Sequence, residues 1–306
     1  MAYKQRTKIL ISTTLLILLS LLGLTVSGNH AGSSLDANTP SLLDAAAIEA
    51  KKEALRYREK QRELNAAVEA YFRKAIASGE IVGAGVSVVK GDSIVLARGF
   101  GKKNIRTGAQ VNDQTVFRLG SLSKGFAGVL AAHAKNEGTL DWGVRVNEFL
   151  PEFQLGDPKN TSKITLAHLL SHSSGAPYHS YTNLVEAGLP LTDIASRFKE
   201  VTPVSEPGEP YSYQNALYAL SGELIHRSTA EESTTALANR FFKPLEMCST
   251  FTYHQSLLEA GNIATPHSKT RRGWRERKIR DNYYNAVAAG GINASASDMG
   301  RWMRFL

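Results

Sequence analysis

One change of sequence pattern, near residue 80, constrains the fold of this chain more than any other feature. Gly79 ends a helix whose apolar face is formed by Leu64, Val68, Tyr71, Phe72, Ala75 and Ile76. The residues from Ile81 to Lys90 then predict a strand, Gly91-Asp92 a tight turn, and the residues from Ser93 to Gly99 the partner strand. We therefore expect a helix that leads directly into an antiparallel hairpin.

Beyond the hairpin the pattern is mainly helical. Helices are predicted at residues 126–137, 165–172, 214–227, 231–241 and 296–306, with little strand pattern between about 100 and 280 and no internal repeat. A sheet that opens before a helical insertion is normally completed after it, whereas this chain stops at Leu306 inside an amphipathic helix. We therefore expect the C-terminal strands of the sheet to be missing.

The composition is that of an ordinary globular protein, with 42% hydrophobic and 21% charged residues, which excludes a disordered or collagen-like chain. The formal net charge of +8 is concentrated in short stretches of the chain. Part of it precedes the first apolar run, and part lies in the basic run Lys269–Arg280, which we interpret as a solvated loop. A nucleic-acid partner is therefore not expected. The single cysteine, Cys248, excludes an intrachain disulfide and a cysteine-based metal site, and we expect its small side chain to be buried.

The N-terminus has the pattern of an export segment. Residues 1–8 are polar and basic, residues 9–26 are uncharged and rich in Leu and Ile, and a small polar stretch runs to residue 34. This order predicts a secretory signal. The apolar run also approaches the ~20 residues that span a bilayer, so an uncleaved membrane anchor stays open. We expect residues 1–34 to be a signal peptide or an anchor, and the protein to be extracytoplasmic, either periplasmic or secreted, or tethered to the inner membrane through residues 9–26.

Between this segment and the hairpin, residues 35–63 are Ala-rich and then highly charged. This composition predicts a solvated helical linker. The catalytic or binding part of the chain is therefore expected at residues 64–306.

The sharpest chemical signal is the stretch Phe117–Phe126. Gly120 suits a turn into a helix start, so that Ser121 and Lys124, three positions apart, lie on one helical face. A serine hydroxyl needs a neighbouring base, and a lysine desolvated in a pocket loses its charge more easily. The helix N-terminus favours negative charge on an attacked carbonyl. Ser123 points away from this face and is the weaker nucleophile candidate. Alone, the pair also fits a capping serine beside a surface lysine.

Three further blocks of sequence favour the catalytic interpretation of the serine–lysine pair over the capping one. They are Thr165-Leu166-Ala167-His168-Leu169-Leu170-Ser171-His172-Ser173-Ser174-Gly175, then Tyr211-Ser212-Tyr213-Gln214-Asn215, and finally Ala289-Gly290-Gly291. With the serine–lysine pair, and in this order, they resemble the class C β-lactamase and penicillin-binding serine hydrolase family over roughly residues 65–306. The resemblance implies an α+β fold of the β-lactamase/transpeptidase type, in which an antiparallel sheet borders a large helical region.

The resemblance also implies a role for each site residue. Ser121 matches the acylated nucleophile and Lys124 the lysine of the S-x-x-K motif. Tyr213 and Asn215 match the Y-x-N element, in which the tyrosine helps to move protons and the asparagine holds the substrate amide. A phenol beside a cationic lysine gives up its proton more easily, which agrees with that role. Tyr211 is the rival of Tyr213, but it lacks an asparagine two residues later.

One departure from the family pattern is large. The third motif, K-[ST]-G or H-[ST]-G, has no match after Asn215, because Lys269-Thr270-Arg271 lacks the glycine and precedes the Ala-Gly-Gly block. In the family, one oxyanion N–H comes from the nucleophile and the other from the strand with this motif. We therefore expect this chain to correspond to an N-terminal portion of a longer protein, to hold only the Ser121 N–H, and to be nearly inactive by itself.

The resemblance implies a serine hydrolase that works through an acyl-enzyme on a small molecule or peptide, without cofactor or metal. β-Lactam hydrolysis is the first expectation, because the serine–lysine block and Tyr-x-Asn look closest to class C enzymes. A D-Ala-D-Ala carboxypeptidase (penicillin-binding protein) or an esterase is the alternative, since the block from His168 to Gly175 is more typical of those relatives. A non-catalytic binding remnant is the second alternative. His168 and His172 are interpreted as structural.

Overall fold

The computed structural model describes residues 42–306. The signal or anchor predicted at residues 1–34 lies outside the described residues. Among residues 42–306, no helix is both long and apolar enough to cross a membrane. The chain divides into two units, Met1–Tyr57 and Arg58–Leu306. The boundary predicted between residues 63 and 64 stays a prediction, and it falls within one continuous helix, α2 (Leu42–Ala77).

Helix α2 changes character along its length. Every side chain from Asp44 to Lys60 is exposed, as expected for a solvated helix. From Leu64 onward the predicted apolar face becomes partly buried, although Tyr71 remains 67% exposed. The helix ends ahead of Gly79, whose φ of +70° is a left-handed conformation that glycine adopts without strain.

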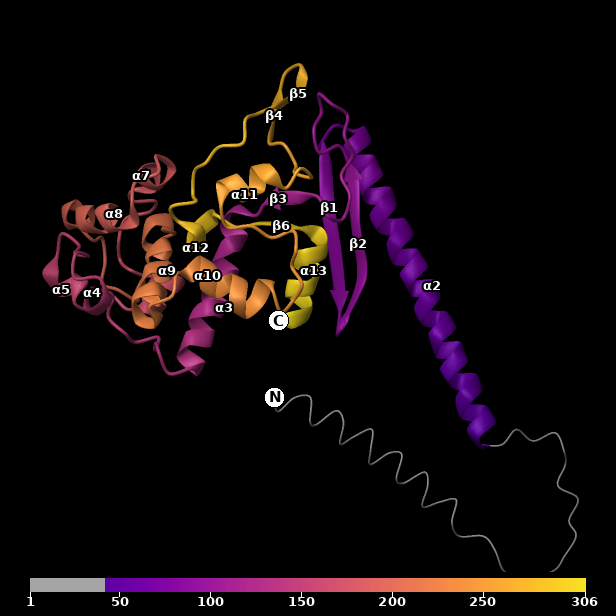
Figure 1. Ribbon diagram of the computed structural model, residues 1–306, viewed down its shortest axis with the longest axis horizontal. Coiled ribbons are helices and arrows are strands. Elements are labelled where there is room, and N and C mark those ends of the chain that lie inside the picture. Colours follow the sequence, from indigo (N-terminus) through magenta and orange to yellow (C-terminus); the bar gives the residue numbers. More distant parts are fainter. Residues whose placement is uncertain (1–41) are drawn as a thin grey trace, which may run out of the picture. The chain divides into compact units, whose positions relative to one another are not determined.

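The predicted hairpin is confirmed. Strand β1 (Gly83–Lys90) pairs antiparallel with β2 (Ser93–Gly101), and a bulge shifts the register between Val88 and Val89. On one side, Phe72 of α2 stacks on Phe100 with the ring centroids 5.0 Å apart. On the other side lies helix α13 (Ala296–Phe305), as Figure 1 shows.

Glycines allow α13 to lie close to the hairpin. A Cβ at Gly300 would lie only 2.4 Å from Ser87 Oγ, and a Cβ at Gly85 would lie 3.2 Å from Ala296 Cβ. Side chains at either position would push the helix off the strands. The last helix is therefore an integral layer over the sheet.

The helical region contains the core. Its main helices are α3 (Ser123–Asn136) and α9 (Asn215–Thr229), with the short α12 (Val287–Gly290) packed against both (Figure 1). Phe126 is fully buried and stacks on Trp302 of α13 at 4.2 Å. The remaining helical segments are η1 (Gly120–Leu122), α4 (Val146–Phe149), α5 (Pro158–Thr161), α6 (Leu166–Leu170), α7 (Thr182–Glu186), α8 (Leu191–Arg197), η2 (Phe198–Glu200), α10 (Ser233–Leu237), η3 (Ala238–Phe242) and α11 (His254–Glu259).

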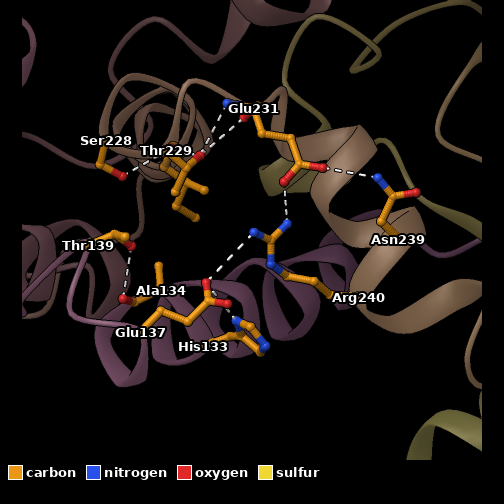
Figure 2. Close-up of polar contacts among 10 residues, drawn as sticks. His133, Ala134, Glu137, Thr139, Ser228, Thr229, Glu231, Asn239 and Arg240 are labelled. Atoms are coloured by element: carbon orange, nitrogen blue, oxygen red, sulfur yellow. Dashed lines mark hydrogen bonds and ion pairs between the residues drawn. The ribbon is translucent and has the colours of Figure 1, made fainter.

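A polar network ties the far end of α3 to the segment after α9. Figure 2 shows Arg240, in the π-helical turn η3, between Glu231 and Glu137. Asn239 donates to Glu231 at 3.1 Å, and Glu137 lies 3.2 Å from His133 Nδ1. These contacts join the C-terminal end of α3 to the segment after α9.

Two further small sheets complete the described residues. Strand β3 (Val116–Arg118), which ends two residues before Gly120, pairs with β6 (Asn293–Ser295). Strands β4 (His267–Thr270) and β5 (Gly273–Glu276) form a hairpin.

The basic stretch Lys269–Arg280 is mostly exposed, as expected, but residues 269–276 belong to this hairpin, so the prediction of a loop was wrong there. Gly273 takes a φ of +101°, which closes the turn between the two strands. Lys269 Nζ and Trp274 Nε1 both donate to the carbonyl of Gly79, at 2.8 and 3.0 Å. These bonds fasten the hairpin to the end of α2.

The expected burial of Cys248 was also wrong, because its side chain is an exposed free thiol. Glu246 has a left-handed φ of +55°, and Cys248 N–H bonds to its carbonyl at 2.9 Å. This turn directs Met247 into the core, where it is 3% exposed, and leaves the next side chain outside.

Candidate active site

The two neighbouring serines of the motif have opposite surroundings. A 3₁₀ turn, η1 (Gly120–Leu122), carries Ser121 into the start of α3, and Ser121 is exposed. Ser123 is fully buried, and its Oγ accepts a hydrogen bond from Ile292 N at 3.0 Å. The first serine is therefore accessible to a substrate, whereas the second fastens α3 to the segment before β6.

The structure brings the four predicted site residues together. Ser121 Oγ lies 2.6 Å from the hydroxyl of Tyr213, which comes from the segment before α9. Lys124 Nζ lies 3.4 Å from the same Oγ and 2.8 Å from Asn215 Oδ1. Tyr211 is 69% exposed and has no comparable contact with the serine among the hydrogen bonds of the described residues.

Lys124 is largely enclosed by polar and aromatic neighbours. Its side chain is 9% exposed, and Nζ also donates to the carbonyl of Ala289 at 2.8 Å. The ammonium lies 4.8 Å from the ring centre of Tyr213 and 5.3 Å from that of Tyr218. Burial lowers the pKa of Lys124 from its ordinary value, and the interaction with Tyr213 partly opposes this shift. No carboxylate bonds to Nζ in the described residues, so nothing of opposite full charge cancels the effect.

Asn215 is the first residue of α9 and is buried. While its Oδ1 accepts from Lys124, its Nδ2 donates to the hydroxyl of Tyr283 at 3.1 Å. The asparagine therefore holds the lysine in place, and its amide group is itself held from the opposite side.

Sequence reasoning missed several residues that shape this site. Ala289 acts only through its main-chain carbonyl, which no side-chain pattern reveals. Tyr283 packs over Gly290 and Gly291, where added Cβ atoms would lie 2.9 Å from its ring and 2.6 Å from its carbonyl oxygen. The Gly-Gly pair was therefore the available signal for a close neighbour. Tyr218 donates its hydroxyl to the carbonyl of Lys124 at 2.8 Å.

The two histidines of the intervening block differ in position. His168 forms a capping box with Thr165 at the start of α6, which bears out its predicted structural role. His172 lies in the site region, with its ring centre 4.4 Å from that of Tyr213. Residues 42–306 contain no cluster of three or more histidine, cysteine or acidic side chains suited to a metal ion.

A family model described as Beta-lactamase matches residues 68–306. The chain belongs to the beta-lactamase family. Membership of the beta-lactamase family supports a hydrolase, and it agrees with the resemblance inferred from the four sequence blocks.

Two curated proteins illustrate how far this beta-lactamase family member has diverged. Protein flp of Staphylococcus aureus is 27% identical over 174 residues, which cover 56% of this chain and 35% of that protein. Unguisins hydrolase ungD of Aspergillus violaceofuscus is 25% identical over 252 residues, covering 76% of this chain and 43% of that protein. The chain therefore spans less than half the length of either relative.

A solved structure agrees on the fold. The octameric penicillin-binding protein homologue from Pyrococcus abyssi matches with a TM-score of 0.68 and 22% identity, over 78% of this chain and 55% of that chain. The predicted α+β fold of the β-lactamase/transpeptidase type is thereby confirmed for this beta-lactamase family chain.

Proposed function

We propose that this protein is a serine hydrolase that forms an acyl-enzyme at Ser121. The observation that carries the proposal is the contact of 2.6 Å between Ser121 Oγ and the Tyr213 hydroxyl, with Lys124 Nζ 3.4 Å from the same oxygen. An exposed hydroxyl beside two groups able to exchange protons is the arrangement that an activated serine requires.

In the first half-reaction, Ser121 Oγ attacks the substrate carbonyl carbon and loses its proton to the Tyr213–Lys124 pair. The bond to the leaving group then breaks, and the pair returns that proton to the departing nitrogen or oxygen. In the second half-reaction, water attacks the acyl carbon and gives a proton to the pair, which passes it to Ser121 Oγ. The sum is hydrolysis of one amide or ester bond, with the enzyme regenerated.

The contacts of Lys124 suit both of its protonation states. As an ammonium it can donate to Asn215 Oδ1, the Ala289 carbonyl and Ser121 Oγ. As a neutral amine it keeps the two short bonds of 2.8 Å and turns its lone pair toward Ser121. The lysine can therefore take up and release a proton without leaving its neighbours unpaired.

β-Lactam amide hydrolysis is the substrate class we propose first. The family description and the name of the Pyrococcus abyssi protein, a penicillin-binding protein homologue, support recognition of a β-lactam. Hydrolysis of a peptide amide is the second candidate, because the block around His168 is typical of peptidase relatives. The export segment predicted within residues 1–34 fits an extracytoplasmic substrate of either kind.

A substrate panel tests the proposed reaction. With the whole protein, including any residues that continue it beyond Leu306, we expect repeated hydrolysis of a chromogenic cephalosporin, unaffected by a chelator, because the proposed steps use no metal. Release of a single equivalent would instead assign the protein to the penicillin-binding peptidases. Turnover of short-chain aryl esters alone would favour an esterase. Failure of every substrate, and of labelling by a fluorescent penicillin, would contradict the enzyme proposal and favour a non-catalytic binding protein.

Removal of one hydroxyl group tests the role of Tyr213. We expect Tyr213→Phe to slow acylation by ~10²–10⁴-fold, the range typical of a positioned acid–base group, while the ring packing is kept. The matched control is Tyr211→Phe, which removes a hydroxyl two residues away on an exposed side chain and should leave the rate near that of the wild type. Stopped-flow measurement of the acylation rates of both variants tests this expectation. If the two variants changed the acylation rate equally, the Tyr213 hydroxyl would have no specific role in proton transfer.

A further inference from the structure

We infer that His172 is a positioning residue for Tyr213, and through it for proton transfer at Ser121. The inference rests on the proposed function, because it concerns the geometry of the same site. Its physical basis is that His172 bonds to the main chain on both sides of the tyrosine and packs against the tyrosine ring as well.

The main-chain contacts bracket Tyr213. Ser212 N–H donates to the carbonyl of His172 at 2.7 Å, and Gln214 N–H donates to His172 Nδ1 at 3.2 Å. His172 has a left-handed φ of +57°, uncommon for a residue other than glycine. In this conformation its carbonyl and its ring nitrogen reach the two amides that flank the tyrosine.

The imidazole of His172 also packs against the ring of Tyr213. His172 is 7% exposed, with its ring centre 4.4 Å from that of Tyr213 and 5.1 Å from that of Tyr218. Tyr213 is held from another side by His179, whose main-chain N–H donates to the Tyr213 carbonyl at 3.0 Å. The Tyr213 hydroxyl lies 2.6 Å from Ser121 Oγ. Its position is fixed by the contacts that hold the ring and the backbone of Tyr213.

The hydrogen bond from Gln214 determines the protonation state of the ring. A nitrogen that accepts from an N–H carries no proton, so the imidazole is neutral, with its proton on Nε2. Burial, and secondarily the charge of Lys124, lower the pKa of His172 to about 4. The titratable groups around the ring are Lys124 from α3, Tyr218 from α9, and Tyr211 and Tyr213 from the segment before α9. Protonation of Nδ1 would remove the acceptor for Gln214 N–H.

Two substitutions test the hydrogen-bond acceptor of His172 and its aromatic ring separately. His172→Asn keeps a side-chain acceptor and tolerates the left-handed backbone, whereas His172→Phe keeps an aromatic ring and removes the acceptor. We expect His172→Phe to lower kcat for acylation by ~10²-fold with little change in KM, as misplacement of a reacting group does. His172→Asn should recover most of this loss and stay within about tenfold of the wild type, the scale of one hydrogen bond.

The matched control is His226→Phe, which changes a half-buried histidine in the last turn of α9. Thermal unfolding of all three variants identifies any loss that comes from instability alone. Equal kcat losses in His172→Phe and the control, or no recovery in His172→Asn, would overturn the inference.

A measurement that does not depend on hydrolysis separates this inference from the proposed function. In the ¹⁵N NMR spectrum of the wild-type protein, we expect His172 to show a bare Nδ1 and a protonated Nε2 down to a titration midpoint near pH 4. A ring protonated at Nδ1 near neutral pH would overturn the inference. The expected spectrum, together with activity retained in Ser121→Ala, would instead defeat the proposed function and leave the His172 contacts in place.

Discussion

Replacement of Ser121 by alanine is expected to abolish covalent labelling by a fluorescent penicillin and to reduce turnover on the order of 10⁶-fold, the size seen when a serine nucleophile is removed. Ser121 is exposed, and its hydroxyl contacts the side chains of Tyr213 and Lys124. The alanine therefore removes the attacking oxygen with little effect on the core. Gel fluorescence and steady-state hydrolysis measure the two effects.

Ser123→Ala is the control for this result. It removes a buried hydroxyl that accepts from Ile292 N, so we expect a lower melting temperature with labelling retained. Labelling that persists in Ser121→Ala and disappears in Ser123→Ala would move the nucleophile to the second serine and contradict the proposed geometry.

Lys124→Met is expected to slow acylation by ~10²–10⁴-fold, because the substitution removes the amine that faces Ser121 Oγ while filling much of the same volume. The variant also leaves Asn215 Oδ1 and the Ala289 carbonyl without their donor, so its melting temperature is measured alongside. Lys135→Met, in the same helix, removes an exposed ion pair with Asp141 and should change the rate little. Similar rates in the two variants would exclude Lys124 from the reaction.

The pH dependence of the acylation rate is a second test of whether Lys124 takes part in proton transfer. Because burial lowers the pKa of Lys124 below 10.5, its neutral form appears at lower pH than that of a free lysine. If the neutral amine accepts the serine proton, acylation accelerates as pH rises through this lowered pKa. The same rise should be missing in Lys124→Met. A rise retained in the variant would assign the titration to another group.

Local signals explain why much of this architecture was predictable. The apolar face that begins at Leu64, the helix end at Gly79 and the turn at Gly91 each depend on neighbouring residues alone. The spacing of Ser121 and Lys124 likewise places both on one turn without any tertiary contact. Tyr213 and Asn215 could be named only through the family resemblance, because nothing near them in sequence indicates a partner 92 positions away.

The features that could not be predicted depend on tertiary contacts. The basic stretch from Lys269 forms a hairpin, and Lys269 and Trp274 of that hairpin bond to Gly79, far back in the chain. The helix predicted at 231–241 is present from Ser233, but it continues from α10 into a π-helical turn, η3, in which Arg240 pairs with Glu231 and Glu137. The hairpin's contacts with Gly79, and the Arg240–Glu137 pair, join segments that are far apart in the sequence, and such contacts are not visible in the local pattern.

The distances along the chain within the site bear on how the protein folds. The contact between Ser121 and Tyr213 joins residues 92 positions apart, and that between Lys124 and Ala289 joins residues 165 positions apart. Closing such long stretches of chain costs entropy before the contacts form, and chains rich in long-range contacts fold more slowly. If helices α3 and α9 pack together before α12 docks, Lys124 lacks the Ala289 carbonyl, one of its two acceptors at 2.8 Å. Acylation at Ser121 would therefore report that both long-range contacts have formed, whereas circular dichroism reports the helices alone.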